Sequence, residues 1–242
     1  GGKLTNNAKI TGDKGYGIIS NGTEVENTGN ITLTNPLTSS KPSVGILTQA
    51  GNKITNTGTV TVGNNSVGIF GKEIVQKGIV TVGNGGTGLY SEGGNVTLDS
   101  TSKINTGSNK AVGVFTKGTG QTITANAGST MTIGDSSFGF LNEGKGNTIN
   151  SNVANQTLRN DGTYIYSSDK SGTVNNNTTL TSTGSYNYGL YSAGTVTNNA
   201  DINFGTGLGN VGIYSTYGGR ATNLAGRNIT VGASYKDPTD PL

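Results

Sequence analysis

Short runs of alternating apolar and polar residues recur along the whole chain, with Gly, Asn and Thr gathered between them. The clearest run has five residues, with glycine second and an aliphatic residue third. Its copies start at Tyr16, Val44, Val67, Thr87, Val112, Phe138, Tyr188 and Val211, and a copy without glycine starts at Thr163. Runs of this length and period predict β-strands, and no stretch has a useful helical period. We therefore expect an all-β chain.

The second position of each run serves as an anchor for a repeat. Consecutive anchors lie 28, 23, 20, 25, 26, 25, 25 and 23 residues apart, about 24 on average. The anchors are Gly17, Gly45, Gly68, Gly88, Gly113, Gly139, Tyr164, Gly189 and Gly212. Self-similarity at such a period indicates a repeat architecture, in which each unit buries its apolar face against the next.

Two further short strands fall within each repeat. One resembles 54–58 and reappears around Val25, Val174 and Val196, and the other resembles 60–63 and reappears at 80–83, 131–134 and 229–232. Asn and Gly between the strands supply the left-handed conformations that sharp corners need. The sequence thus predicts a right-handed parallel β-helix (β-solenoid) of about nine coils of roughly 24 residues. We expect residues 1–242 to form a single segment of it, with 10–12 as the last strand of a preceding coil.

Aligning the repeats on their anchors turns the sequence into columns. The column after the anchor is aliphatic or Phe throughout and is the predicted interior ladder, and by alternation we expect the column before the anchor to face inward as well. The second column after the anchor should face outward, and it is rich in aromatic residues. It supplies the candidate ligand-binding strip, Tyr90, Tyr166, Tyr191 and Tyr214. The alternative is that these rings only pack on one another over the small anchors.

Four residues after the anchor, consecutive repeats carry Lys72, Glu92, Lys117 and Glu143. Opposite charges that alternate at strand spacing predict a ladder of ion pairs between coils. Because lysines separate the two carboxylates, this column is a poor candidate for acid–base chemistry. Exposed pairs are worth only about 0.2–1 kcal/mol each. We interpret the column as a row of exposed ion pairs and not as a functional site.

Composition argues against several functional classes. Glycine fills 42 positions, only 30% of residues are hydrophobic and 12% charged, and there is no Cys or His. The commonest general base and the thiolate and imidazole metal ligands are therefore missing. The 13 acidic residues are scattered and the net charge is only +3, so we predict no enzyme, no metal, no cofactor and no nucleic-acid partner. A carbohydrate-active enzyme and an ice-binding face with Thr-x-Thr pairs remain as minor alternatives.

Two repeated phrases carry a resemblance to a known family. Residues 56–63 read Asn-Thr-Gly-Thr-Val-Thr-Val-Gly, and residues 211–215 read Val-Gly-Ile-Tyr-Ser. Repeated over nearly the whole chain, they resemble the passenger domains of large type V autotransporter adhesins, and most closely the fusobacterial RadD-like group. The resemblance implies a cell-surface segment of a longer passenger domain, exported and anchored in the outer membrane through a C-terminal β-barrel that this sequence does not contain. It implies adhesion and virulence, and carries over no individual binding residue.

Our hypothesis is accordingly an adhesin segment that displays loops or faces to a protein or glycan on host or bacterial cells. The second hypothesis is a passive stalk whose adhesive region lies elsewhere. Candidate binding loops are the interruptions at 35–43, 145–160 and 168–177, each of which can also be a tolerated insertion. A further anchor is due near Asp237, where a Tyr-Lys-Asp-Pro stretch breaks the pattern.

Overall fold

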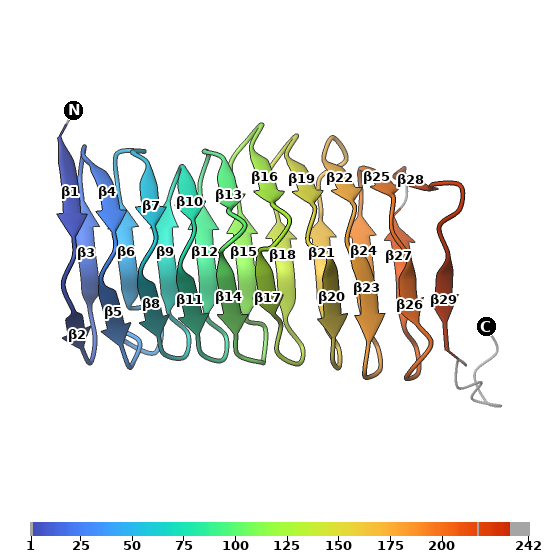
Figure 1. Ribbon diagram of the computed structural model, residues 1–242, viewed down its shortest axis with the longest axis horizontal. Coiled ribbons are helices and arrows are strands. Elements are labelled where there is room, and N and C mark those ends of the chain that lie inside the picture. The colour runs from blue at the N-terminus through green and yellow to red at the C-terminus, as the bar shows by residue number, and fades with distance from the viewer. Residues whose placement is uncertain (1, 217, 233–242) are drawn as a thin grey trace.

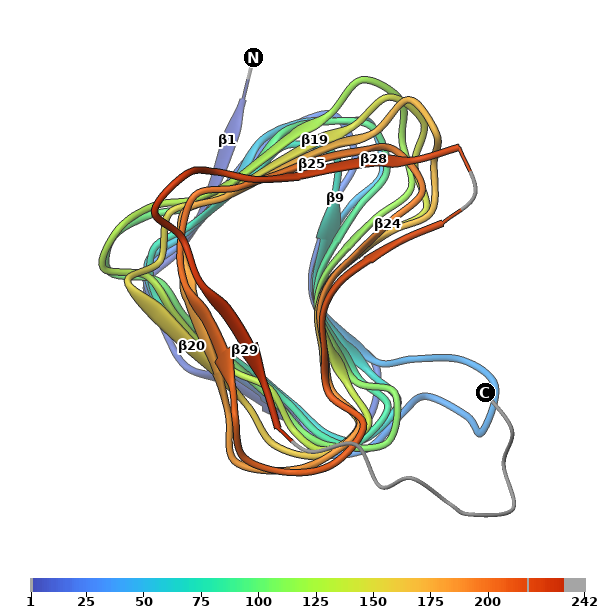
Figure 2. The same cartoon turned by 90° about the vertical axis from the view of Figure 1, so that its right-hand side faces the viewer.

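The computed structural model describes residues 2–216 and 218–232. In these residues the chain forms strands and turns and no helix. Figure 1 shows the strands stacked side by side along one long axis, from β1 at one end to β29 at the other. Seen end-on in Figure 2, with the last coil in front, the chain advances toward the viewer along an anticlockwise path. The molecule is therefore a right-handed β-solenoid of about nine coils, as the repeat predicts.

Each coil contributes one strand to each of three faces. The first, which we call the glycine face, holds the anchors and contains β3 (Tyr16–Ser20), β6 (Val44–Thr48), β9 (Val67–Gly71), β12 (Thr87–Ser91), β15 (Val112–Thr116), β18 (Phe138–Asn142), β21 (Thr163–Ser167), β24 (Tyr188–Ser192) and β27 (Val211–Ser215). The second, the asparagine face, contains β1 (Lys3–Asn6), β4 (Glu24–Asn27), β7 (Ile54–Asn56), β10 (Ile74–Gln76), β13 (Val96–Leu98), β16 (Thr122–Ala125), β19 (Thr148–Ser151), β22 (Thr173–Asn176), β25 (Thr195–Asn198) and β28 (Arg220–Asn223).

The third face, the split face, is divided into two sheets. One contains β2 (Ile10–Gly12), β5 (Asn30–Leu33), β8 (Thr59–Val62), β11 (Ile79–Val82), β14 (Lys103–Thr106) and β17 (Thr130–Thr132). The other contains β20 (Asn155–Leu158), β23 (Thr179–Ser182), β26 (Ile202–Phe204) and β29 (Ile229–Val231). The strand at 10–12 is present as predicted.

The register of the glycine face follows the anchor alignment. Leu89 lies level with Ile69 on one side and with Val114 on the other, and all strand pairs in this face are parallel. The side chains of these three residues are buried, as the interior ladder predicts. Burying an aliphatic side chain of this size contributes roughly 1.5–3 kcal/mol. Stacking of coils thus builds the continuous apolar core that no single coil could form.

The residues that precede the anchors do not all face the interior, so the prediction that this column faces inward is wrong. Tyr16 is 45% exposed, and the rings of Phe138 and Tyr188 contact outward-facing tyrosines. The reason is a bend at the glycine, where both the glycine and the residue after it face inward. A β-carbon on Gly68 would lie 2.6 Å from the carbonyl oxygen of Gly88, so only glycine permits this approach. The alternation of inward-facing and outward-facing side chains is therefore shifted by one residue at the bend.

Buried amides form ladders along a corner of the asparagine face. Asn27 Nδ2 donates to Asn56 Oδ1 at 2.7 Å, and Asn56 Nδ2 donates to Gln76 Oε1 at 2.9 Å. All three side chains are buried, and pairing offsets the cost of removing them from water. The ladder ends where Leu98 takes the next position, which leaves Gln76 Nε2 without a hydrogen-bond partner.

The break in the split face falls between β17 and β20, each of which pairs only with its other neighbour. Tyr164, which replaces the anchor glycine, stands in β21, directly after β20 in the chain. The Tyr164 ring is fully buried, lies 5.6 Å from the ring of Phe140 and places its hydroxyl 2.7 Å from Ser151 Oγ. An aromatic side chain therefore fills the interior beside the break, at a position that elsewhere has no side chain, and in Figure 2 β20 lies outside β29.

Of the three predicted loops, one is a true excursion from the coil. The segment 35–43 projects from a corner in Figure 2 and carries an antiparallel bridge between Thr38 and Lys41. The predictions for 145–160 and 168–177 are wrong as loops, because β19, β20 and β22 run through them in register with the stack. The anchor expected near Asp237 lies outside the described residues.

Candidate functional site

The structure places the four predicted tyrosines on the outer side of the glycine face, in two separate groups. Tyr166, Tyr191 and Tyr214 come from consecutive coils, and their rings stack with centroid distances of 4.6 and 4.7 Å. Tyr90 belongs to another group, with its ring 4.7 Å from those of Phe70 and Phe115. Leu141 occupies the column between the two groups. The predicted strip is therefore interrupted, and only its last three tyrosines lie together.

Ring orientation limits what the three-tyrosine stack can bind. Tyr166, Tyr191 and Tyr214 are inclined to one another by only 22° and 19°, so each ring covers a face of the next. Tyr188 adds edge contacts to Tyr191 and Tyr214. Sugars and cations recognise the face of an aromatic ring, and most faces here are covered. The stack instead presents ring edges and a row of phenol hydroxyls at the spacing of the coils.

Tyr90 is engaged within the protein. Its hydroxyl donates to Glu92 Oε1 at 2.7 Å, and burial together with this carboxylate raises the pKa of Tyr90 well above its ordinary value. The charge column predicted to form a ladder is not paired. Among residues 2–216 and 218–232, no ion pair joins Lys72, Glu92, Lys117 and Glu143. Glu92 bonds to a tyrosine instead, so the ion-pair prediction is wrong.

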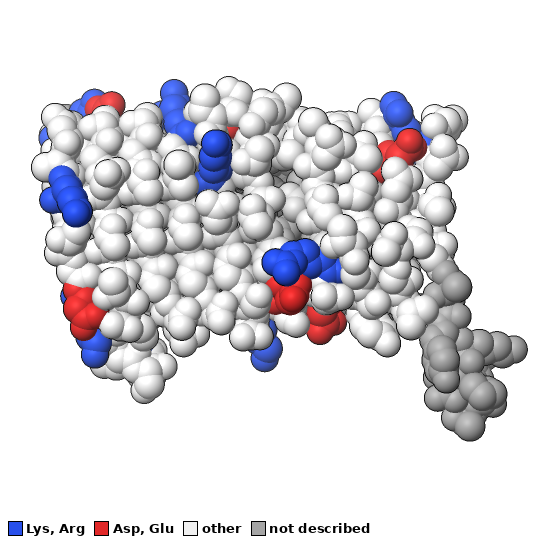
Figure 3. Space-filling model, turned by 60° about the horizontal axis from the view of Figure 1, so that its bottom comes forward, with Lys and Arg blue, Asp and Glu red and all other residues white. Residues whose placement is uncertain are grey.

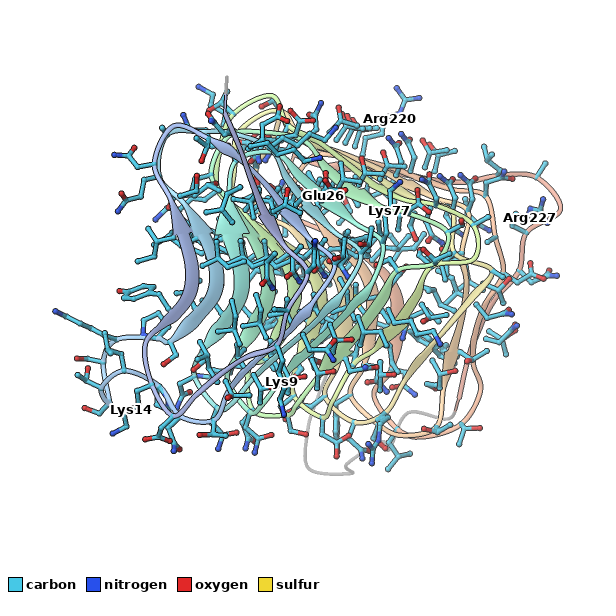
Figure 4. The ribbon with its side chains drawn as sticks, turned by 60° about the vertical axis from the view of Figure 1, so that its left-hand side comes forward. Lys9, Lys14, Glu26, Lys77, Arg220 and Arg227 are labelled. Atoms are coloured by element: carbon cyan, nitrogen blue, oxygen red, sulfur yellow. The ribbon has the colours of Figure 1, made fainter. Side chains whose placement is uncertain are left out.

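Charged side chains are spread over the surface. The face shown in Figure 3 is largely uncharged, and its few acidic groups lie mostly beside basic ones. In Figure 4, Lys14 and Arg227 project outward near opposite ends of the solenoid. No group of three or more acidic side chains placed to hold a metal ion occurs in the described part of the chain. Ion pairs join Lys3 to Glu26, Lys53 to Glu73 and Arg159 to Asp135, so opposite charges are balanced locally at separate places on the surface.

No helix within residues 2–216 and 218–232 is long and apolar enough to cross a membrane.

The projecting segment 35–43 borders a small polar hollow of about 360 Å³. It is lined by Asp13, Lys14, Asn35, Pro36, Thr38 and Ser39. The Asp13 carboxylate accepts hydrogen bonds from Asn35 Nδ2 and Thr34 Oγ1, which lower the pKa of Asp13. Both bonds go to Asp13 Oδ1, so this oxygen braces the base of the excursion against the neighbouring coil.

Two features escaped the sequence reasoning. Gln156 takes an interior position next to Leu180, where neighbouring coils have aliphatic residues or Met131, and its Nε2 donates to the Thr157 carbonyl. Tyr186 has a backbone φ of +59° at a corner, and its side chain is 58% exposed. The signal for the first was a polar residue in an apolar column. The second could be recognised only by aligning the corners as well as the strands.

Comparisons with protein-family models, curated proteins and solved structures gave no significant match.

Proposed function

We propose that this chain is a segment of a cell-surface adhesin, and that the stack of Tyr166, Tyr191 and Tyr214 is its contact surface. The observation that carries the proposal is this row of tyrosines on the outer side of a regular face. Three phenol hydroxyls in line, one per coil, can donate hydrogen bonds to a repetitive polar partner. A protein or glycan on another cell offers acceptors of that kind.

The solenoid suits display at a distance. Each coil adds about 4.8 Å along the axis, so a stack lengthens without changing its cross-section. Glycine-rich coils without cysteine need no disulfide for stability, which is compatible with export of an unfolded chain. Display outside the outer membrane, as an autotransporter passenger, follows from the resemblance of the repeats and belongs to the same proposal.

A passive stalk is the second candidate, and one observation favours it. The tyrosines of the stack cover one another's faces, which is what rings do when their role is packing. In that case the stack stabilises the rod, and another region of a longer protein makes the adhesive contact.

Replacing the three tyrosines by phenylalanine separates the two functions. Y166F/Y191F/Y214F keeps the rings and the stack but removes the row of hydroxyls. If the stack is the contact surface, the purified triple variant should bind partner cells about tenfold more weakly than the parent chain, which corresponds to a loss of about 1.4 kcal/mol. The control is Y16F, which alters an exposed tyrosine of the same face outside the stack.

Binding would be measured by flow cytometry of cells incubated with labelled chain, with thermal unfolding as the check on folding. Equal binding by the triple variant and the parent would remove the stack as the contact surface. A parent chain that neither binds cells nor competes with intact adhesin-bearing bacteria would favour the stalk.

A further inference from the structure

One corner of the solenoid repeats the same backbone conformation in seven consecutive coils. It lies between the split face and the glycine face, and a residue of each of these coils adopts a positive φ of 50–65° there; in one coil the next residue, Lys110, does so as well, at 67°. In six of these coils the backbone N–H at this position donates to a carbonyl of the following coil, for example from Asp161 to Ser185 at 2.8 Å and from Tyr186 to Leu208 at 2.8 Å. The residues at this position are Asn65, Gly85, Asn109, Ser136, Asp161, Tyr186 and Gly209.

Tyr186 is the only aromatic residue in this column, in which Ser136 is the other residue that is not Gly, Asn or Asp. Glycine, asparagine and aspartate adopt left-handed conformations readily, whereas a bulky aromatic residue does so only at a cost in strain. Such strain persists where the surroundings enforce it and is found preferentially at functional positions. A residue with an easier conformation would fit this corner better, so packing alone gives no reason for a tyrosine.

The exposure of Tyr186 also needs an explanation. It is the most exposed large hydrophobic side chain of the described chain, at 58%. Most others in that group, such as Ile19 and Val231, belong to the first or last strands of their faces, which no described coil covers on one side. Tyr186 lies between two coils and is still exposed.

The surroundings of Tyr186 form a small mixed surface. The ring lies against Gly209, where an added β-carbon would come 2.7 Å from Tyr186 Cδ1, and Leu208 beside it is 38% exposed. One coil earlier, at the same corner position, stands the exposed Asp161. Its carboxylate accepts a hydrogen bond from Ser136 Oγ at 3.3 Å, and no ion pair within the described residues includes it.

We propose that Tyr186 and Asp161 together bind an arginine or lysine side chain of a partner protein. The carboxylate supplies the opposite charge, and the exposed ring supplies a cation–π contact. Leu208 covers the aliphatic stem of the bound side chain. This corner is distinct from the tyrosine stack, and the inference rests on the proposed adhesive function by adding a second contact that selects a basic protein partner.

A direct test uses the 242-residue chain and a short peptide of alternating arginine and glycine. The chain is itself basic, with a formal net charge of +3, so general attraction does not favour binding of the peptide. We expect Y186N and D161N each to weaken binding about fivefold or more, as measured by NMR titration of the amide signals, and Y186F to retain it. A peptide with citrulline in place of arginine should not bind.

Folding does not obscure the outcome. Asparagine accepts a positive φ, so Y186N should unfold at a higher temperature than the parent while binding less. Y16N is the control for loss of an exposed tyrosine elsewhere. Unchanged binding by Y186N and D161N would overturn the inference, as would equal binding of the citrulline peptide. If the parent chain binds cells and Y186N binds them equally well, the proposed contact at Tyr186 and Asp161 is refuted, whereas the proposed adhesive function is not.

Discussion

At the scale of single residues, the backbone at the anchor decides where side chains point. Where the anchor is glycine, the absence of a side chain lets the carbonyl of the following anchor lie against it. The bend shifts the alternation by one position, and this places both the column before the anchor and the aromatic column on the outer side. The tyrosine stack and its edge contacts with Tyr188 follow from that shift.

The anchor glycines should therefore tolerate no side chain. In Gly68→Ala the new methyl group would lie 2.6 Å from both the Gly88 carbonyl oxygen and Val80 Cγ1, so the strand or its neighbour must move. We expect a loss of about 1–3 kcal/mol in the free energy of unfolding, measured with urea. Gly205→Ala is the matched control, because its nearest neighbour would be 3.8 Å away, and it should change stability little. Equal losses for the two variants would contradict the role of the anchor.

Tyr164 should make the protein sensitive to alkaline pH. Burial raises its pKa above the ordinary value of 10.0, while the hydroxyls of Ser151 and Thr178 act in the opposite direction. Above pH 10 the unfolded chain loses this proton and the folded chain keeps it, so the free energy of unfolding falls as pH rises. Y164F should flatten the stability profile above pH 10 in chemical denaturation. A steep decline that persists unchanged in Y164F would exclude this residue as the cause.

At the scale of the elements, the break between β17 and β20 is the main departure from regularity. The strands remain tied near their ends, by bonds from Asn152 N to the Ala125 carbonyl and from Ser136 N to the Asn160 carbonyl, each 2.9 Å long. Between these ties a groove of about 360 Å³ opens, lined by Thr130–Ile133, Asn155–Thr157 and Arg159. The Gln156 amide, which donates to the Thr157 carbonyl, replaces one main-chain donor at the break.

Hydrogen exchange should locate this break. Thr130 N–H donates to the Ser102 carbonyl of the preceding coil, so alternation along the strand directs the Met131 and Ile133 N–H groups toward the gap. We expect these two amides to exchange faster than those of Val80 and Ile104, which occupy the equivalent position within continuous pairing. Equal protection at Met131 and Ile104, followed by NMR, would mean that the sheet is continuous in solution.

The sequence allowed the glycine-face strand of every coil to be predicted, because the anchor repeat sets the register. It did not reveal β19 and β20, which lie in a segment that we expected to be a loop. It did not reveal the bend, since strict alternation assumes a straight strand. The burial of Tyr164 could not be predicted either. The sequence shows that the anchor glycine is replaced, but not that the tyrosine side chain points into the core. Of the candidate site, the tyrosine column was predicted, whereas its division at Leu141 and the covering of ring faces depended on packing.

At the scale of the whole molecule, one property underlies both proposed contacts. Because coils lie level with one another, a residue type repeated every two dozen positions becomes a line on the surface. The tyrosine stack is one such line, and the corner that carries Asp161 and Tyr186 is another. Aligned positions in a solenoid can therefore act together although they are distant in sequence.

Distances between spin labels test this stacking most directly. Thr32 and Thr132 occupy one outward column and are separated by four coils, whereas Thr181 stands two coils further along the same face. With a rise of about 4.8 Å per coil, labels on cysteines at these positions should give backbone separations of about 19 Å for Thr32–Thr132 and about 29 Å for Thr32–Thr181. Pulsed electron paramagnetic resonance would measure both pairs. An increase of about 10 Å between them supports the stacked coil, and distances that do not grow with the number of intervening coils would contradict it.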